Sequence, residues 1–425
     1  MHPESHASAS PRKPNADSMK HVKEEMTVKA EKSFRDHCFF SSLEPIVQVF
    51  VLDSMLSVKK LSIDYRKAFL TCCLNFLNSA NNDSFEAAPP KVMHIVRSFV
   101  QSDFISMPET RAIVLPLRRC LERIVADRHA ITALHAVFVQ LCVSLDMYDV
   151  ALPLVSSPIY DIHSTFLPTS LEYLSFHYFS GLVYAAFKRF DKALSSFDLA
   201  IGAISVQISA IQIAAYKKRV LIDIIVNGSH TPLTKLISPI VVKNIETLSA
   251  PYHQFTVSAA LGHQSLETSF REHQGQLLQD GNIGLAKQAL SSIQKMQIAK
   301  LAGSYMTLSL FEIAKMIGIE NLASVEDIVL CMIEEGSINA TIDQSRQMLT
   351  FFDDSGTFAD QESLDKLFEQ LQEISAAHDR VLAKNIALAT DNRFLSKSVE
   401  SHSNPEAGMF STSEMPFSDM HQLFG

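Results

Sequence analysis

Residues Thr307–Phe352 read TLSLFEIAKMIGIENLASVEDIVLCMIEEGSINATIDQSRQMLTFF, and their hydrophobic period changes at Gly336. Before Gly336, apolar residues recur every three or four positions, as they do on one face of a helix. After it they alternate, which is typical of a half-buried strand. The stretch therefore predicts a short extended run, two helices and a hairpin. This is the order of a winged helix.

Both predicted helices carry recognisable ends. Gly318 ends the first one, because a residue without Cβ closes a helix C-terminus at little cost. Ser324 is expected to cap the second helix, with Asp327 complementing the helix dipole in its first turn. The second helix should bury one apolar stripe, which consists of Val325, Ile328, Val329, Met332 and Ile333. The wing is expected to contain residues 338–342 and 348–352.

The charge of this winged helix argues against nucleic acid. No Lys or Arg lies between Lys315 and Arg346, whereas six acidic residues do: Glu320, Glu326, Asp327, Glu334, Glu335 and Asp343. A helix that enters a groove of a duplex must neutralise phosphates. The sequence therefore favours a protein-interaction winged helix, and a nucleic-acid reader is the competing interpretation from a different class.

The composition points to a multidomain protein of the cytoplasm and nucleus. The 425 residues, 47% of them hydrophobic, suffice for two or three packed units. A net charge of -9 argues against a general binder of nucleic acid or anionic membranes. The six cysteines form no CxxC pair, which is typical of reduced, buried thiols. No signal-like apolar run opens the chain, and the uncharged stretch Leu199–Tyr216 is interpreted as a buried repeat helix because one of its faces is polar.

The remaining chain is predicted to be helical. Residues 1–33 should form a disordered arm, 34–250 a helical-repeat solenoid and 251–306 a set of connecting helices that lead into the winged helix at 307–353. One repeat has the spacing of a tetratricopeptide hairpin, with Phe190–Lys192 as its turn and small or aromatic residues at the helix contact: Gly181, Tyr184, Ala193, Phe197 and Ala200. The stretch Leu134–Leu154 fits another helix hairpin, without that motif.

A long C-terminal helix is predicted at 361–390, followed by a flexible tail at 391–425. Its seam repeats at alternating spacings of three and four residues, a pattern typical of a coiled coil or helix bundle. The seam, which is the candidate partner-binding site, consists of Leu364, Leu367, Leu371, Ile374, His378, Val381, Asn385 and Leu388. His378 and Asn385 are interpreted as polar residues that set the register, and the competing interpretation of His378 is a pH switch.

No constellation of residues predicts catalysis, a metal or a cofactor. The 16 histidines form neither HExxH nor His-x-His, and no phosphate-binding glycine loop or Gly-x-Ser-x-Gly elbow occurs. The adjacent Cys72 and Cys73, like Cys331, lie in apolar surroundings that do not activate a thiol. We therefore expect no catalytic residue, no metal ligand and no cofactor.

The chain resembles the PCI-domain family, a module shared by the proteasome lid, the COP-nine signalosome and translation initiation factor three. The order of helical repeats, winged helix and C-terminal helix matches, and four local runs carry the likeness. They are Tyr178–Ile201 (YFSGLVYAAFKRFDKALSSFDLAI), Ala215–Arg219 (AYKKR), Asp280–Ser292 (DGNIGLAKQALSS) and Met332–Gln344 (MIEEGSINATIDQ). The PCI domain would span about residues 200–353.

The last of these runs favours a signalosome subunit over a proteasome-lid subunit. The resemblance implies a non-catalytic scaffold within a hetero-oligomer that removes a ubiquitin-like modifier from cullins through a separate metalloprotease subunit. It also implies partners among PCI and metalloprotease-type subunits, edge-to-edge contacts between winged helices, and entry of the C-terminal helix into a common bundle. Neither nucleic acid nor membrane is an expected partner.

Overall fold

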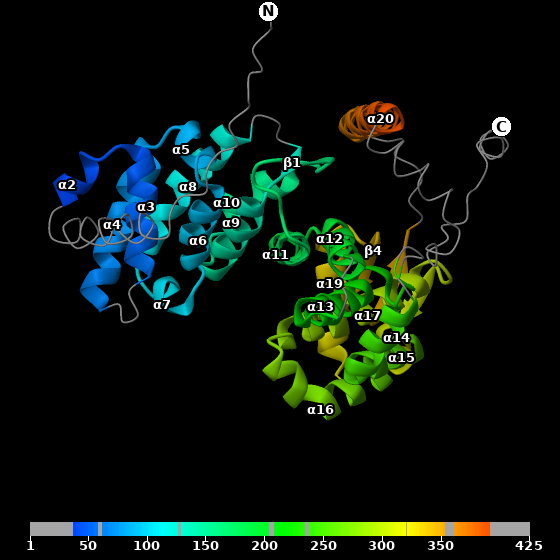
Figure 1. Ribbon diagram of the computed structural model, residues 1–425. Helices are drawn as coiled ribbons and strands as arrows, with labels where there is room; N and C mark the ends of the chain where they lie inside the picture. Colours follow the sequence, from blue (N-terminus) through cyan, green and yellow to red (C-terminus); the bar gives the residue numbers. More distant parts are fainter. Residues whose placement is uncertain are drawn as a thin grey trace, which may run out of the picture. The chain divides into compact units, whose positions relative to one another are not determined.

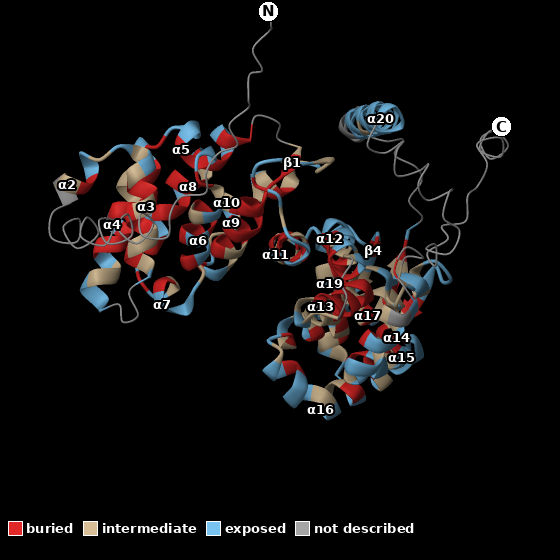
Figure 2. Ribbon diagram, in the orientation of Figure 1, coloured by how far each residue is buried: buried red, intermediate tan, exposed pale blue. Residues whose placement is uncertain are grey.

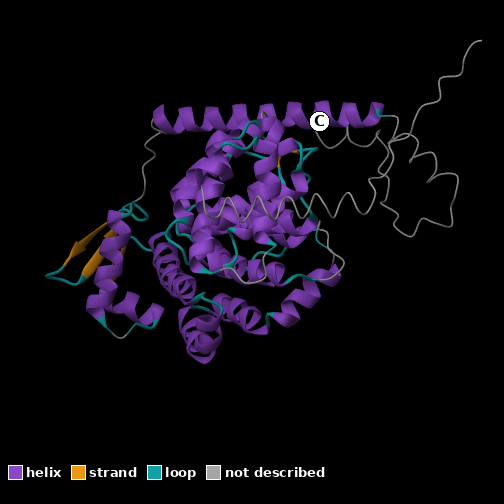
Figure 3. Cartoon of the chain, turned by 60° about the vertical axis from the view of Figure 1, so that its left-hand side comes forward, coloured by secondary structure: helices purple, strands orange, loops and turns teal. Residues whose placement is uncertain are grey.

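The computed structural model describes residues 37–57, 62–125, 129–203, 208–233, 237, 239–319, 321–352 and 361–391. The predicted arm at 1–33, the link at 353–360 and the tail beyond Asp391 lie outside these residues. The chain divides into two compact units, Met1–Asp353 and Asp354–Gly425. Helices dominate both units (Figures 1 and 3), which confirms the predicted mostly helical class.

The first unit begins with the helices of the repeat region. In chain order they are α2 (His37–Ser41), α3 (Pro45–Leu56), α4 (Ile63–Ser79), α5 (Asn82–Glu86), α6 (Pro89–Ser98), α7 (Ser102–Ile105), α8 (Thr110–Ile124), α9 (Ala133–Ser144), α10 (Tyr148–Ser156), α11 (Ser170–Ala186), α12 (Phe190–Gly202) and α13 (Ala210–Asn227). Two two-residue strands, β1 (Ala130–Ile131) and β2 (Asp161–Ile162), pair in parallel. Neighbouring helices pack in succession, from α4 on α8 and α8 on α9 through α11 on α12 to α13.

Each helix of the repeat region buries its apolar side against its neighbours (Figure 2), and the resulting core, which starts at Phe40, continues beyond this region to Ile293. A capping box starts α11, in which Thr169 and Glu172 satisfy each other's backbone N–H groups. Glu172 also accepts a hydrogen bond from Arg97 Nε at 3.2 Å, which ties α11 to α6. Helix hairpins stacked in this way are the architecture of a solenoid.

The tetratricopeptide-like hairpin consists of α11 and α12, but its turn lies earlier than predicted. The turn spans residues 187–189, where Lys188 adopts a left-handed conformation (φ 56°), and Phe190 already belongs to α12. Leu199–Tyr216 is also not the single helix expected, because α12 ends at Gly202 and α13 starts at Ala210. Ser209 caps α13 by accepting a hydrogen bond from the backbone N–H of Ile211, so this polar residue marks a helix start within the stretch.

Four further helices lead to the winged helix: α14 (Pro239–Leu248), α15 (Ala250–Leu261), α16 (His263–Gln279) and α17 (Ile283–Ala302). The winged helix follows, with β3 (Thr307–Ser309), α18 (Leu310–Ile317), α19 (Leu322–Glu334), β4 (Ala340–Asp343) and β5 (Met348–Phe351). Its three strands lie in the antiparallel order β3-β5-β4, with Leu308 opposite Leu349 and Ile342 opposite Leu349 on the other side.

The predicted helix, helix and hairpin are thus present, but the second helix begins earlier than its predicted cap. Asn321 caps α19 by accepting a hydrogen bond from the N–H of Ala323 at 3.1 Å, and Ser324 lies inside the helix. Gly318 ends α18 in the left-handed conformation (φ 82°), as expected. The second unit is described by one helix, α20 (Gln361–Thr390).

Candidate functional site

The winged helix has a core of its own, which fixes the face that it can offer to a partner. Val325, Val329 and Met332 of α19 are buried, whereas Ile328 and Ile333 at the edges of the stripe are half-buried. Leu310, Ile313 and Ile317 of α18 lie in the same cluster. The side chains that remain exposed are therefore available for contacts: Tyr305, Met306, Phe311, Met316, Leu330 and Phe352.

The outer surface of α19 is acidic in the structure, as the sequence predicts. Asp327, Glu334 and Glu335 are exposed and Glu326 is half-buried. A nearby cation, Lys295 of α17, donates a hydrogen bond to Glu335 at 2.6 Å, so it offers little charge to a phosphate. Because α19 occupies the position of the second helix, this face would repel a nucleic-acid backbone.

The three-stranded sheet leaves two outer edges in the described part of the first unit. β5 lies in the centre, so β3 and β4 each pair on one side only. Unpaired backbone N–H and C=O groups along a strand edge can hydrogen-bond to another chain. The wing is therefore chemically suited to contact a second polypeptide.

In the second unit, α20 is coloured mostly as exposed in Figure 2, and every residue of the predicted seam is exposed. Its six apolar members are between half and two-thirds exposed: Leu364, Leu367, Leu371, Ile374, Val381 and Leu388. His378 is exposed as well, and its Nδ1 lies 3.5 Å from the neighbouring Asp379 carboxylate. Asn385 is likewise exposed.

Sequence reasoning missed three large apolar residues beside the seam. Phe368, Leu382 and Ile386 are all at least half exposed, and each comes directly after a seam position in the sequence. With them the apolar face covers an arc of about 160° at the ~100° rotation per residue of an α-helix. A plot on the 3.6-residue period would have found them, whereas the heptad spacing alone selects only the narrow seam. The face is therefore wider than a two-stranded coiled coil requires.

Four buried thiols, those of Cys72, Cys73, Cys120 and Cys142, are not arranged for nucleophilic chemistry. Burial raises the pKa of Cys72 and that of Cys142 to about 12, and it raises the pKa of Cys73 and Cys120 as well. A thiol that stays protonated at neutral pH is a weak nucleophile. Cys331 on α19 is half-buried and lies 3.6 Å from Lys295 Nζ and 3.3 Å from Glu335 Oε1, so its surroundings are charged and not apolar as the sequence predicted.

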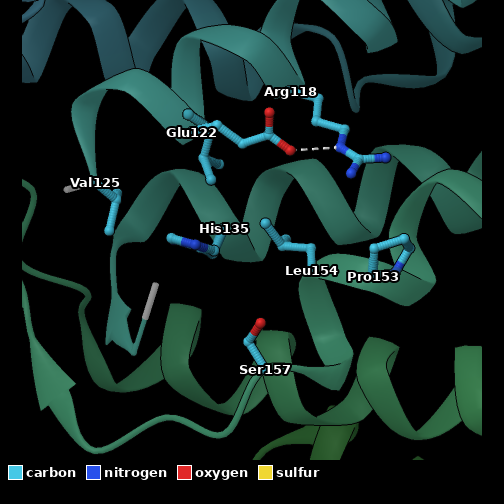
Figure 4. Close-up of a pocket in the computed structure, with 8 residues that line it drawn as sticks. Arg118, Glu122, Val125, His135, Pro153, Leu154 and Ser157 are labelled. Carbon is cyan, nitrogen blue, oxygen red and sulfur yellow. Dashed lines mark hydrogen bonds and ion pairs between the residues drawn. The ribbon is translucent and has the colours of Figure 1, made fainter. Parts of the chain in front are cut away.

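A cavity of about 390 Å³ lies between α8, α9 and α10 and contains the most suggestive side chains, Ser157 and His135 (Figure 4). They do not form a catalytic pair, because no hydrogen bond joins them and His135 instead pairs with Thr132 at the start of α9. Burial, together with His163, lowers the pKa of His135 to about 4, so its ring is neutral at pH 7. The Arg118–Glu122 ion pair, 2.9 Å long, occupies the upper wall.

The described residues offer neither a metal-binding group nor a membrane-spanning helix. These residues contain no group of three or more His, Cys, Asp or Glu side chains placed to hold a metal ion. None of their helices combines the length and apolar character needed to cross a bilayer. The features with an evident capacity for contact are thus the winged helix and α20.

Comparison with known families matches two parts of the chain. Residues 41–241 match the family model described as "COP9 signalosome complex subunit 3, N-terminal helical repeats", and residues 270–353 match the PCI domain. Among curated proteins, COP9 signalosome complex subunit 3 of Dictyostelium discoideum is 29% identical over 84% of this chain and 85% of its own length. The protein of the same name from Arabidopsis thaliana is 28% identical over 76% of this chain and 74% of its own.

The helical repeats and the winged helix therefore define a PCI-domain protein. The two family models and both relatives place the chain more narrowly. It belongs to the family of COP9 signalosome complex subunit 3.

Proposed function

We propose that the chain is a non-catalytic scaffold subunit of a COP9 signalosome, a complex that removes a ubiquitin-like modifier from cullin-RING ubiquitin ligases. Both curated relatives bear the name of a signalosome subunit, which favours this assignment over a proteasome-lid subunit. Its partners would be other signalosome subunits, of the PCI and metalloprotease types. We also propose that it works in the cytoplasm and the nucleus, which imaging of a fluorescently tagged chain would test.

One observation carries the scaffold role: α20 presents a broad, exposed apolar face on a helix of 30 residues. An exposed apolar patch of this kind marks a protein interaction surface. At ~1.5 Å per residue the helix is about 45 Å long, which allows it to pack along other helices over several turns. The exposed apolar residues of the winged helix and the two strand edges add a second contact surface.

Truncation before Gln361 tests this role. The shortened chain retains the first compact unit and should remain soluble, with a cooperative thermal transition like that of the full chain. It should, however, fail to co-purify with tagged neighbouring subunits, or do so only weakly, on size-exclusion chromatography. Assembly of the truncated chain at full stoichiometry would show that α20 is not the bundle element and that the winged helix carries assembly alone.

The nucleic-acid alternative makes a different prediction. A winged helix that binds DNA or RNA through phosphates loses affinity steeply as salt rises. With the acidic surface of α19, we expect no saturable binding to duplex DNA or to RNA in a salt titration. Binding with a steep salt dependence would favour the alternative class.

A further inference from the structure

A cavity of about 320 Å³ in the first unit brings together stretches that lie far apart in the sequence. Tyr178 of α11 lines it, together with the α13 residues 210–218 and with Asp280 and Asn282 at the turn between α16 and α17. Three of the runs that carry the family resemblance thus meet at one place. The volume lies near the lower end of the ~300–1,000 Å³ range of ligand pockets, so it suits one or two side chains.

One of the two lysines in the cavity is fully engaged. Lys217 Nζ donates to both carboxylate oxygens of Asp280, at 2.9 and 2.8 Å, and lies 5.4 Å from the centroid of the Tyr252 ring. Asp280 accepts a further hydrogen bond from Tyr252 Oη at 2.9 Å. Burial alone would raise the pKa of Asp280, but the hydrogen bonds from Lys217 and Tyr252 outweigh it and hold the pKa below its ordinary value. Lys217 and Asp280 therefore neutralise each other.

The second lysine is not neutralised. Lys218 Nζ donates one hydrogen bond, 2.7 Å long, to the amide oxygen of Asn282. That amide is held in place because Asn282 Nδ2 donates to Tyr252 Oη at 2.8 Å. An ammonium group has three N–H donors, and the carboxylate of Asp280 forms its ion pair with Lys217 and not with Lys218. Burial lowers the pKa of Lys218, since desolvation disfavours the charged form, and Asp280 offsets this only in part.

Tyr178 supplies another free donor on the same cavity. Its ring packs against Phe179 and Phe197, with centroids 5.2 and 6.2 Å away. Its hydroxyl forms no hydrogen bond with any side chain or backbone group that the structure describes. Burial raises the pKa of Tyr178, so the hydroxyl keeps its proton at neutral pH. The described buried polar atoms that lack a partner do not include this hydroxyl, so it is open to solvent and can donate to a ligand in the cavity.

We propose that this cavity binds a single carboxylate of a partner polypeptide, with Lys218 and Tyr178 as its donors. Two lysines and one aspartate leave one positive charge, which a monoanion balances. The apolar wall of Ala210, Ile213 and Ala214 accommodates an apolar side chain next to the carboxylate. A phosphate dianion fits less well, because Asp280 repels it and no arginine fork lines the cavity. The inference adds a docking site to the assembly role and does not rest on it.

The test measures binding of the dipeptide acetyl-Leu-Glu-amide to the full chain by saturation-transfer difference NMR. We expect saturable binding that acetyl-Leu-Gln-amide, of the same shape but without the charge, does not show. Lys218→Gln should weaken binding by about tenfold or more, as expected for loss of a charged hydrogen bond. Tyr178→Phe, which keeps the ring and removes only the hydroxyl, should weaken it by a smaller factor.

Two controls keep the result interpretable. Lys287→Gln removes the same charge from an exposed position on α17 that does not line the cavity, and it should leave binding unchanged. Circular dichroism melting of each variant shows whether it folds, and Lys218→Arg, which retains the charge, should preserve part of the binding if Lys218→Gln fails to fold. Equal binding of the Glu and Gln peptides, or of Lys218→Gln and the unaltered chain, would overturn the proposal. Displacement of the peptide by inorganic phosphate at lower concentration than by acetate would overturn the choice of a carboxylate.

Discussion

At the scale of single residues, Gly181 sets the distance between α11 and α12. A Cβ built on Gly181 would lie 2.6–2.9 Å from three ring atoms of Phe197, closer than atoms in a folded protein can approach. Phe197 is fully buried, so its ring has little room to move. The glycine is therefore required by packing, because its backbone does not adopt a left-handed conformation.

We predict that Gly181→Ala lowers the free energy of unfolding by about 1–3 kcal/mol, the usual cost of overpacking a core. The matched control is Gly275→Ala in the middle of α16, where a new Cβ would meet no atom within 4 Å. Alanine at such a site stabilises a helix by about 0.5–1 kcal/mol relative to glycine. The midpoint of urea denaturation should therefore fall for Gly181→Ala and rise for Gly275→Ala. A shift of the same sign in both variants would contradict the packing argument.

The buried histidines make stability depend on pH. Burial lowers the pKa of His177 to about 4, and burial with His163 does the same for His135. Because a histidine of the unfolded chain has a pKa near 6.5, the unfolded state binds more protons between pH ~6.5 and ~4, and stability falls as the pH is lowered through this window. Each histidine should cost about 2 kcal/mol on going from neutral pH to pH ~5.

We therefore predict that His177→Leu loses less stability than the unaltered chain when urea denaturation is compared at pH 7.5 and pH 5. His253→Leu, at an exposed position of α15, is the control and should keep the full pH dependence. If both variants lose as much stability as the unaltered chain, the titration of His177 does not contribute.

At the scale of elements, α19 offers three consecutive positions with different surroundings. Val329 is fully buried, Ile328 is half-buried and Leu330 is 43% exposed. We predict that Val329→Asp unfolds the winged helix, since an unpaired buried carboxylate costs several kcal/mol. Ile328→Asp should be less damaging and Leu330→Asp nearly neutral, as measured by thermal melting. Any other order would mean that the buried stripe is wrongly assigned.

The C-terminal helix separates assembly from folding. We predict that replacing Leu371 and Ile374 together by Asp abolishes co-purification with neighbouring subunits and leaves the melting temperature unchanged, because both side chains are exposed in the chain. Gln372→Asp with Ala376→Asp adds the same two carboxylates to the opposite face of α20 and should leave assembly intact. Equal loss in both variants would show that added charge, and not the apolar face, is responsible.

The elements also show how far a sequence can be interpreted. The winged helix was predictable because its hydrophobic period changes at Gly336, where the φ angle is 68°. Its second helix is capped by Asn321 and not by Ser324, because two good capping residues lie three positions apart and propensity does not choose between them. The turn at Lys188 was not predicted because a lysine rarely adopts the left-handed conformation that it has here.

The candidate sites were less accessible to prediction. The heptad spacing of the sequence predicts the seam of α20. The wider face with Phe368, Leu382 and Ile386 is found only when all residues are placed on the 3.6-residue period of the helix. The cavity around Lys218 could not be predicted at all. Its residues come from α11, α13 and the turn before α17, and no local sequence pattern predicts that these segments lie close together.

At the scale of the whole molecule, the sequence contains neither His-x-His nor HExxH, the spacings with which histidines bind a catalytic zinc ion. We expect the purified chain to have no isopeptidase activity on a modified cullin and to bind no stoichiometric zinc. Elemental analysis and a cleavage assay on the isolated chain check this, with the assembled complex as the positive control. One tightly held zinc ion per chain would contradict it.

The exposed apolar face of α20 also affects how long the chain survives in a cell. Chaperones and proteases recognise exposed apolar surface, and a chain without partners presents that surface continuously. Copies made in excess of the other subunits would therefore be degraded faster than assembled ones. The level of this protein would then follow the supply of its partners more closely than its own rate of synthesis.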